Sequence, residues 1–192
     1  MDGLKESIGF ATEELSVLEK SRETAIACSR RVIRLTKMLI HDIHIRADSE
    51  DDLDKLESEM ENLRSVCGDS FILSSGPVQD AMGEYAEAVI FHSVMNGMPI
   101  PDHRSLRITA SAWVLGLADS EGELRRAVMT RLMDGDLDDA KAIFSAMESI
   151  HEQVMLLDVP DAVAPVRRKQ DIARGIMDKT RSDITTASIM KR

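Results

Sequence analysis

The sequence predicts an all-α fold, an antiparallel bundle of about seven helices in one domain spanning residues 1–192. Three observations predict it. Aromatic residues make up only 3% of the chain, whereas good helix formers such as Leu, Met, Ala, Glu and Arg dominate. Apolar residues recur at intervals of three and four, the period of a helix that is buried on one face. Glycine and proline gather at a few short breaks, and short connectors favour antiparallel neighbours.

The first element expected is a long helix, or two helices, over residues 4 to about 47. Basic residues interleave with its apolar pattern and give this segment a basic side: Arg22, Arg30, Arg31, Arg34 and Lys37. The next helix is expected to begin after Ser49, an N-cap residue followed by acids in the first turn, where the helix dipole favours negative charge. It is expected to end near Gly68.

Start and stop signals divide the second half of the chain. Residues 74–77 combine cap residues with a proline that a first helical turn tolerates, and residues 96–101 contain two prolines and a glycine, which indicate a connector. Asp136 is expected to cap a helix, and Pro160 and Pro165 to separate that helix from the last one. The helices expected here cover about 77–95, 102–133 and 136–157, and a last one ends at about 188.

Charge and cysteine content narrow the classes of function. A formal charge of −10 excludes a global basic footprint, so any nucleic acid must be bound by local Arg and Lys clusters or through metal ions. Cys28 and Cys67 lie far apart in helical patterns and are expected to be reduced thiols. The chain shows neither a signal peptide nor a membrane-spanning run, which predicts a cytoplasmic protein with no membrane partner.

Two pairs of carboxylates have the spacing of ligands on a helix face. Asp119 and Glu123 are four residues apart, and Glu84 and Glu87 are three apart, so each pair lies on one side of its helix. A short connector between the two helices favours packing one beside the other, where the four acids could meet. Oxygen ligands of this kind suit Mg²⁺ or Mn²⁺, which can hold a phosphate. On spacing alone, however, a solvated acidic face remains the better interpretation of such pairs.

Other signals are weaker. His41 and His44 are three apart, but no further ligand completes a metal set, which favours histidines of the helix surface or the core. Gly116 and Gly122 are interpreted as points where helices approach closely. Trp113 is expected in the core or in a subunit contact.

The strings LGLADSEGELRR and GEYAEAVIF resemble the translin family, and more specifically translin-associated factor X and its archaeal relatives. The resemblance extends to the N-terminal segment around Arg22, Arg30 and His44 and to RRKQDIAR at residues 167–174, so it covers nearly the whole chain in order. It implies an all-α fold that assembles into a closed, hollow homo-oligomer, with a hexamer to an octamer expected. It further implies binding of single-stranded RNA and of single-stranded DNA.

Factor X differs from translin itself in carrying a metal-dependent endoribonuclease site made of acidic residues. The resemblance places these acids on Glu84, Glu87, Asp119 and Glu123, all of them acidic here, which matches the nuclease branch of the family. His92 departs from the factor X pattern, where a neutral polar residue is commoner.

The resulting hypothesis is a divalent-metal-dependent endoribonuclease that acts on single-stranded or short structured RNA. Mg²⁺ or Mn²⁺ held by the four acids would bind the RNA phosphate and activate a water. Expected contacts to neighbouring phosphates come from one of Arg125 and Arg126, and from the basic segment that includes Arg30 and Arg34; ordinary surface ion pairs explain these arginines equally well. Two alternatives stay open, an oligomer that binds nucleic acid without cleaving it and a purely structural helical assembly.

Overall fold

The computed structural model describes residues 3–68 and 71–191, and within these residues the chain forms helices and no strand. The predicted all-α fold is therefore confirmed. Six long helices and one short 3-10 helix cover these ranges: α1 Leu4–Ile45, α2 Glu50–Cys67, η1 Phe71–Ser74, α3 Gly76–Met95, α4 Ala110–Met133, α5 Leu137–Met155 and α6 Val166–Met190.

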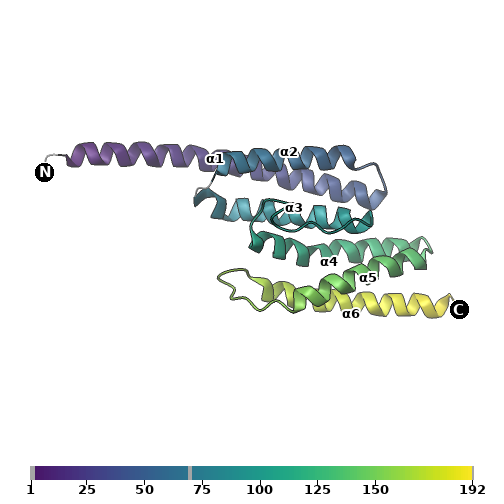
Figure 1. The fold of residues 1–192 in the computed structure, drawn as a ribbon. Coiled ribbons are helices and arrows are strands. Elements are labelled where there is room, and N and C mark those ends of the chain that lie inside the picture. Colours follow the sequence, from purple (N-terminus) through teal and green to yellow (C-terminus); the bar gives the residue numbers. More distant parts are fainter. Residues whose placement is uncertain (1–2, 69–70, 192) are drawn as a thin grey trace.

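The helices lie side by side, with α1 between α2 and α3, and with α5 and α6 both packed against α4 (Figure 1). α1 and α2 form one edge of the bundle, α3 and α4 its middle, and α5 and α6 the other edge. Neighbours joined by short connectors run antiparallel, as predicted, but α3 and α4 run in the same direction. The reason is the connector of residues 96–109, which returns along the bundle before α4 begins.

This connector corrects one predicted boundary, because the helix expected from residue 102 begins only at Ala110. The side chain of Asp102 turns the chain back, since its Oδ1 accepts hydrogen bonds from the backbone N–H of Arg104 at 3.0 Å and of Ser105 at 2.7 Å. Thr109 then caps α4 by accepting a hydrogen bond from the N–H of Ala112 at 3.2 Å. The predicted end of this helix at Met133 is confirmed.

A continuous apolar core joins the helices from α1 to α6. The face of α4 formed by Leu117, Leu124 and Val128 is buried, as expected for a helix with one apolar side. Trp113 is half-buried, packs against the core and donates its indole N–H to the carbonyl oxygen of Pro101 at 2.9 Å. None of the described helices combines the length and apolar character that a bilayer crossing requires.

Candidate active site at the crossing of α3 and α4

The two acid-bearing helices approach most closely at Gly116. A Cβ atom added to Gly116 would lie 2.4 Å from the carbonyl oxygen of Gly83 and 2.9 Å from the amide nitrogen of Glu87, so no larger residue fits at this crossing. Because α3 and α4 run in the same direction, this contact brings Glu87 on α3 close to Asp119 on α4, less than one turn beyond Gly116. The expected role of Gly116 is confirmed, whereas Gly122 has no described atom within 4 Å of an added Cβ and does not serve such a contact.

The α3 acids, Glu84 and Glu87, are half-buried and face no cation directly. Among the residues that the structure describes, neither carboxylate takes part in a hydrogen bond or an ion pair. Burial raises the pKa of Glu87 to about 8, and repulsion from Asp119, Glu84 and Glu123 adds to the increase. Burial also raises the pKa of Glu84, while the charge of Lys37 opposes that rise. Glu87 thus lies close enough to the other three acids for the charge of each to oppose its ionisation.

The α4 acids, Asp119 and Glu123, are each matched by a cationic or protonatable group from a distant part of the chain. Lys169 on α6 places Nζ 2.6 Å and 2.7 Å from the two carboxylate oxygens of Asp119. His44 near the end of α1 places Nε2 2.5 Å from Oε2 of Glu123, and its ring packs against Phe91 with the ring centroids 4.9 Å apart. The hydrogen bond from His44 lowers the pKa of Glu123 despite the burial of that carboxylate.

An open cavity of about 600 Å³ lies beside these acids. Glu84, Asp119 and Lys169 line it together with Asp80 and Gln79 of α3 and apolar residues of α1 and α4, whereas Glu87 and Glu123 are not among its lining residues. The crossing therefore offers carboxylates and one amine to a ligand in the same recess. Over the described part of the chain, however, no three His, Cys, Asp or Glu side chains come close enough together to hold a metal ion as they stand.

Basic residues of α1 follow a stripe that ends at this site. Arg30, Arg34, Lys37, His41 and His44 are separated by four, three, four and three residues, so they lie along one side of the helix. Arg30 and Arg34 are exposed, Lys37 is close enough to influence the pKa of Glu84, and His44 contacts Glu123. The stripe places positive charge on the approach to the carboxylates.

The two arginines after Glu123 point in different directions, as the sequence predicts. Arg125 donates to the hydroxyl of Thr180 at 2.8 Å and to Asp183 at 2.9 Å, and so joins α4 to α6 rather than facing the acids. Arg126 is exposed and lies 3.7 Å from Glu123, which leaves it as the member of this pair at the edge of the site.

Sequence reasoning missed Lys169 and set His44 aside as a histidine of the surface or core. Lys169 is 50 residues from Asp119, and His44 is 79 residues from Glu123, so helical spacing carries no information on either contact. A signal for His44 did exist, because it continues the spacing of Arg30 and Arg34. Lys169 lies within the family-like string RRKQDIAR of residues 167–174, but that resemblance assigned it no role.

Comparison with known proteins gives a consistent result. No model of a known protein family matches the chain. An uncharacterised protein of Methanocaldococcus jannaschii is 34% identical over 188 residues, which cover 97% of this chain and 83% of that protein. The solved structure of AfC3PO is 30% identical, with a TM-score of 0.83 over 96% of this chain and 98% of that one.

Two further structures agree. AfC3PO in complex with duplex RNA gives a TM-score of 0.86 at 28% identity, over 96% of this chain and 97% of that one. NeC3PO without ligand gives 0.82 at 22% identity, over 94% and 96%, a likeness that concerns the fold alone. The chain belongs to the translin superfamily. Membership of the translin superfamily confirms the family assignment made from the LGLADSEGELRR and GEYAEAVIF strings.

Proposed function

We propose that this protein is a divalent-metal-dependent endoribonuclease of the translin superfamily that cleaves single-stranded or short structured RNA. The observation that carries the proposal is the convergence of two carboxylate pairs at the Gly116 crossing, where burial first, and repulsion from the other three acids second, raise the pKa of Glu87 to about 8. A structural protein has no evident need for such a cluster, because half-buried acids that repel one another lower the stability of the fold. A functional ligand that relieves the repulsion accounts for it.

The donor chemistry fits a hard divalent cation. Glu84, Glu87, Asp119 and Glu123 offer only carboxylate oxygens, the ligands that Mg²⁺ and Mn²⁺ prefer, and the α3 pair has no competing ion pair among the described residues. A bound cation would stabilise the negative charge that develops on the scissile phosphate. Lys169 and His44 hold Asp119 and Glu123 in place at the crossing.

RNA binding is the second part of the proposal. The chain as a whole carries a formal charge of −10, so RNA needs a local path of positive charge to approach the acids. The α1 stripe supplies this path through Arg30 and Arg34, and Arg126 supplies a further cation at the edge of the site. AfC3PO, which superimposes over almost the whole chain, has been solved with duplex RNA.

Assembly into a closed, hollow homo-oligomer belongs to the same proposal, with a hexamer to an octamer expected from the family. Single-strand preference would then come from a narrow entrance, since the chain has only one Trp, one Tyr and four Phe on which bases could stack. Single-stranded DNA is a further candidate ligand, because contacts to phosphates do not distinguish it from RNA.

A second function, binding of RNA without cleavage, is favoured by one observation. Lys169 already neutralises Asp119, and His44 holds Glu123, so half of the acid set is engaged within the chain. In this alternative the acids serve packing, and metal ions have no role in the chemistry.

Cleavage of labelled RNA in Mg²⁺ or Mn²⁺ separates the two functions. The nuclease proposal expects Glu84→Ala with Glu87→Ala to abolish cleavage while RNA binding persists. The matched control, Glu152→Ala with Asp178→Ala, removes two exposed acids from α5 and α6 and should cleave as the wild type does. Wild-type protein that retains RNA but never cuts it in either metal would support binding without turnover.

A further inference from the structure

The N-terminal part of α1, residues 4–20 and hereafter the arm, has no packing partner in the chain. It extends beyond the other helices as a single rod (Figure 1), and every one of its residues is exposed. Large apolar side chains are nevertheless frequent in it. Leu4 is 57% exposed, Ile8 59% and Leu15 65%, and Phe10 and Val17 are equally open. A solvated helix does not need these residues.

The arm carries a heptad seam. Its seam residues are separated by four, three, four and three positions, the spacing of a helix that packs along its length against another helix: Leu4, Ile8, Ala11, Leu15 and Leu18. After Arg22 the same alternation continues into the part of α1 that lies in the bundle, where every member is buried: Ala25, Ser29, Val32, Thr36, Leu39 and Ile43. One stripe thus runs along the whole helix, but α2 and α3 cover only its second half.

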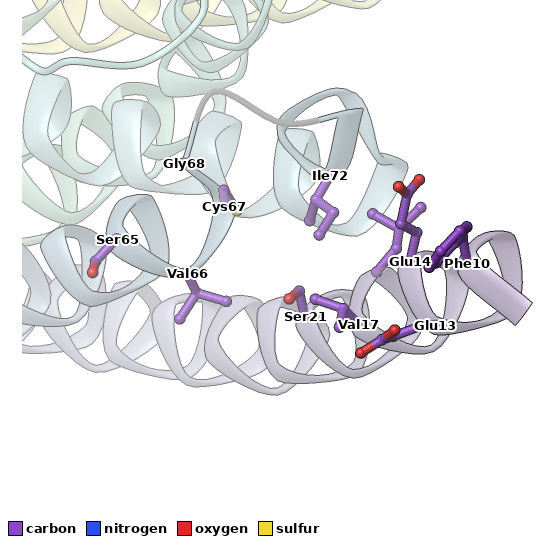
Figure 2. A pocket seen from close by; sticks show the side chains of 11 residues that line it. Phe10, Glu13, Glu14, Val17, Ser21, Ser65, Val66, Cys67, Gly68 and Ile72 are labelled. Atoms are coloured by element: carbon purple, nitrogen blue, oxygen red, sulfur yellow. The ribbon is translucent and has the colours of Figure 1, made fainter.

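A notch marks the place where the cover ends. α2 runs antiparallel to α1 and stops at Cys67, and beyond it an open recess of about 580 Å³ lies between the end of α2 and the arm. Figure 2 shows Val66 and Gly68 on one side of this recess and Phe10, Glu14 and Val17 of the arm on the other. Leu18 belongs both to the lining of the notch and to the seam. An antiparallel helix laid on the arm would continue the line of α2 and end at the notch.

We propose that the arm pairs with the arm of a second copy of this chain in an antiparallel two-helix contact. A second copy is the occupant that fits, because the contact is isologous and each arm offers the other the seam that it needs to cover. The contact is independent of RNA cleavage and concerns a surface remote from the four acids.

Charges beside the seam favour the antiparallel orientation. In the antiparallel pair, Ile8 packs against Leu18 of the second copy. Lys5 of each copy then lies beside Glu19 of the other, which gives two attractive contacts, and the two Glu14 side chains face each other across the two-fold axis. In a parallel pair, Glu14 would lie beside Glu19 twice, and Lys5 would have no acidic partner. The antiparallel pair therefore has two attractive contacts and one repulsive contact, against two repulsive contacts in the parallel pair.

Substitution of the seam tests the contact through the mass of the assembly. In the full chain, Leu15→Asp places a charge in the seam, whereas Ser16→Asp places the same charge on the neighbouring position outside it. Sedimentation equilibrium should show the mass of the Leu15→Asp particle reduced by about half or more at a protein concentration where Ser16→Asp matches the wild type. Circular dichroism checks that both variants remain helical. A Leu15→Asp particle of wild-type mass would overturn the proposal.

Disulfide cross-linking tests the orientation without weakening the seam. Lys5→Cys and Glu19→Cys are made as separate, differently tagged variants and are oxidised alone and after co-expression. The antiparallel contact predicts a disulfide only between the two different variants, because each new cysteine lies far from the same position in the second copy. Wild-type protein, in which Cys28 and Cys67 are both buried, serves as the uncrosslinked control. Self-linking of Glu19→Cys alone, or no link in the co-expressed pair, would contradict the inference.

Discussion

The two helices that form the candidate site supply similar acids in different electrostatic settings. On α4, Asp119 is paired with Lys169, and Glu123 with His44, so each carboxylate has a partner from another helix. On α3, the carboxylates of Glu84 and Glu87 have no such partner among the described residues. The result is opposite pKa shifts, since the pKa of Glu123 is lowered and that of Glu87 is raised to about 8.

This difference indicates which half of the site responds to a ligand. The α4 acids are held in place by the fold itself, whereas the α3 acids gain the most from a cation, because the charges of Lys37 and Lys169 offset their burial and repulsion only in part. A metal ion that enters near Glu87 must also displace a proton below about pH 8. The site thus combines a fixed half with a half whose charge depends on occupancy.

The largest effect is expected from Glu87→Gln on RNA cleavage. The amide keeps the shape of the side chain but removes a charged ligand, so the rate in Mg²⁺ should fall about 1000-fold, the scale of a lost metal contribution. Single-turnover cleavage of labelled RNA measures it, with Glu152→Gln on α5 as the exposed control. A Glu87→Gln rate within tenfold of the wild type would remove Glu87 from the catalytic set.

The same substitution should have the opposite effect on stability. A carboxyl group whose pKa is higher in the folded state than in the unfolded state destabilises the fold as pH rises from about 4.5 towards 8. Without metal, Glu87→Gln should therefore raise the free energy of unfolding by about 2 kcal/mol at pH 9 and have little effect at pH 4. The upper limit is about 5 kcal/mol, because each unit of the pKa rise from 4.5 to about 8 corresponds to about 1.36 kcal/mol.

Glu123 should behave in the reverse manner, because its pKa is lowered. Its contribution to stability is present above the unfolded pKa and is lost as pH falls through the folded value, so Glu123→Gln should destabilise the protein at neutral pH. Urea unfolding in EDTA at several pH values compares both variants with the wild type. Equal pH dependence in the two variants would show that the difference between α3 and α4 has no energetic consequence.

Competition between Lys169 and a metal ion gives a smaller effect. The ammonium group lies 2.6 Å from Asp119 and occupies oxygens that a cation would use. Lys169→Met should therefore tighten Mn²⁺ binding by roughly tenfold, or about 1.4 kcal/mol, because the ion pair is partly exposed and therefore weak. Calorimetric titration with Mn²⁺ measures it, and Lys179→Met, an exposed position on the same helix, is the control. Weaker Mn²⁺ binding by Lys169→Met would instead indicate that Lys169 holds Asp119 ready for the metal.

Most of the fold could be predicted because its signals are local. The start of α4 is an exception: the sequence predicts it near Asp102, but Asp102 forms a turn and Thr109 caps the helix seven residues later. The direction of α4 depends on the same connector. The order of the helical segments does not specify how the connector of residues 96–109 crosses the bundle.

The candidate site was predictable only in part, for the same reason. The i, i+3 and i, i+4 spacings placed each acid pair on one face, and the identity of Gly116 predicted a close contact. The groups that distinguish the pairs, Lys169 and His44, come from helices remote in sequence. Glu121 shows the limit clearly, since it lies between Asp119 and Glu123 in sequence but is fully buried against His151 at 3.0 Å.

An effect of similar size, on RNA affinity, is expected from the basic stripe of α1, which reaches Glu84 through Lys37 and Glu123 through His44. Arg30→Ala with Arg34→Ala removes two exposed cations from the approach to the acids, so RNA affinity should fall about tenfold near 0.1 M salt. The slope of log affinity against log salt should decrease by about 1.4, or about 0.7 for each phosphate contact with a single strand. Filter binding over a salt series measures both quantities. The control, Arg174→Ala with Lys179→Ala, changes the net charge equally at two exposed positions of α6. Equal losses of affinity in the two double variants would assign RNA binding to overall charge rather than to this stripe.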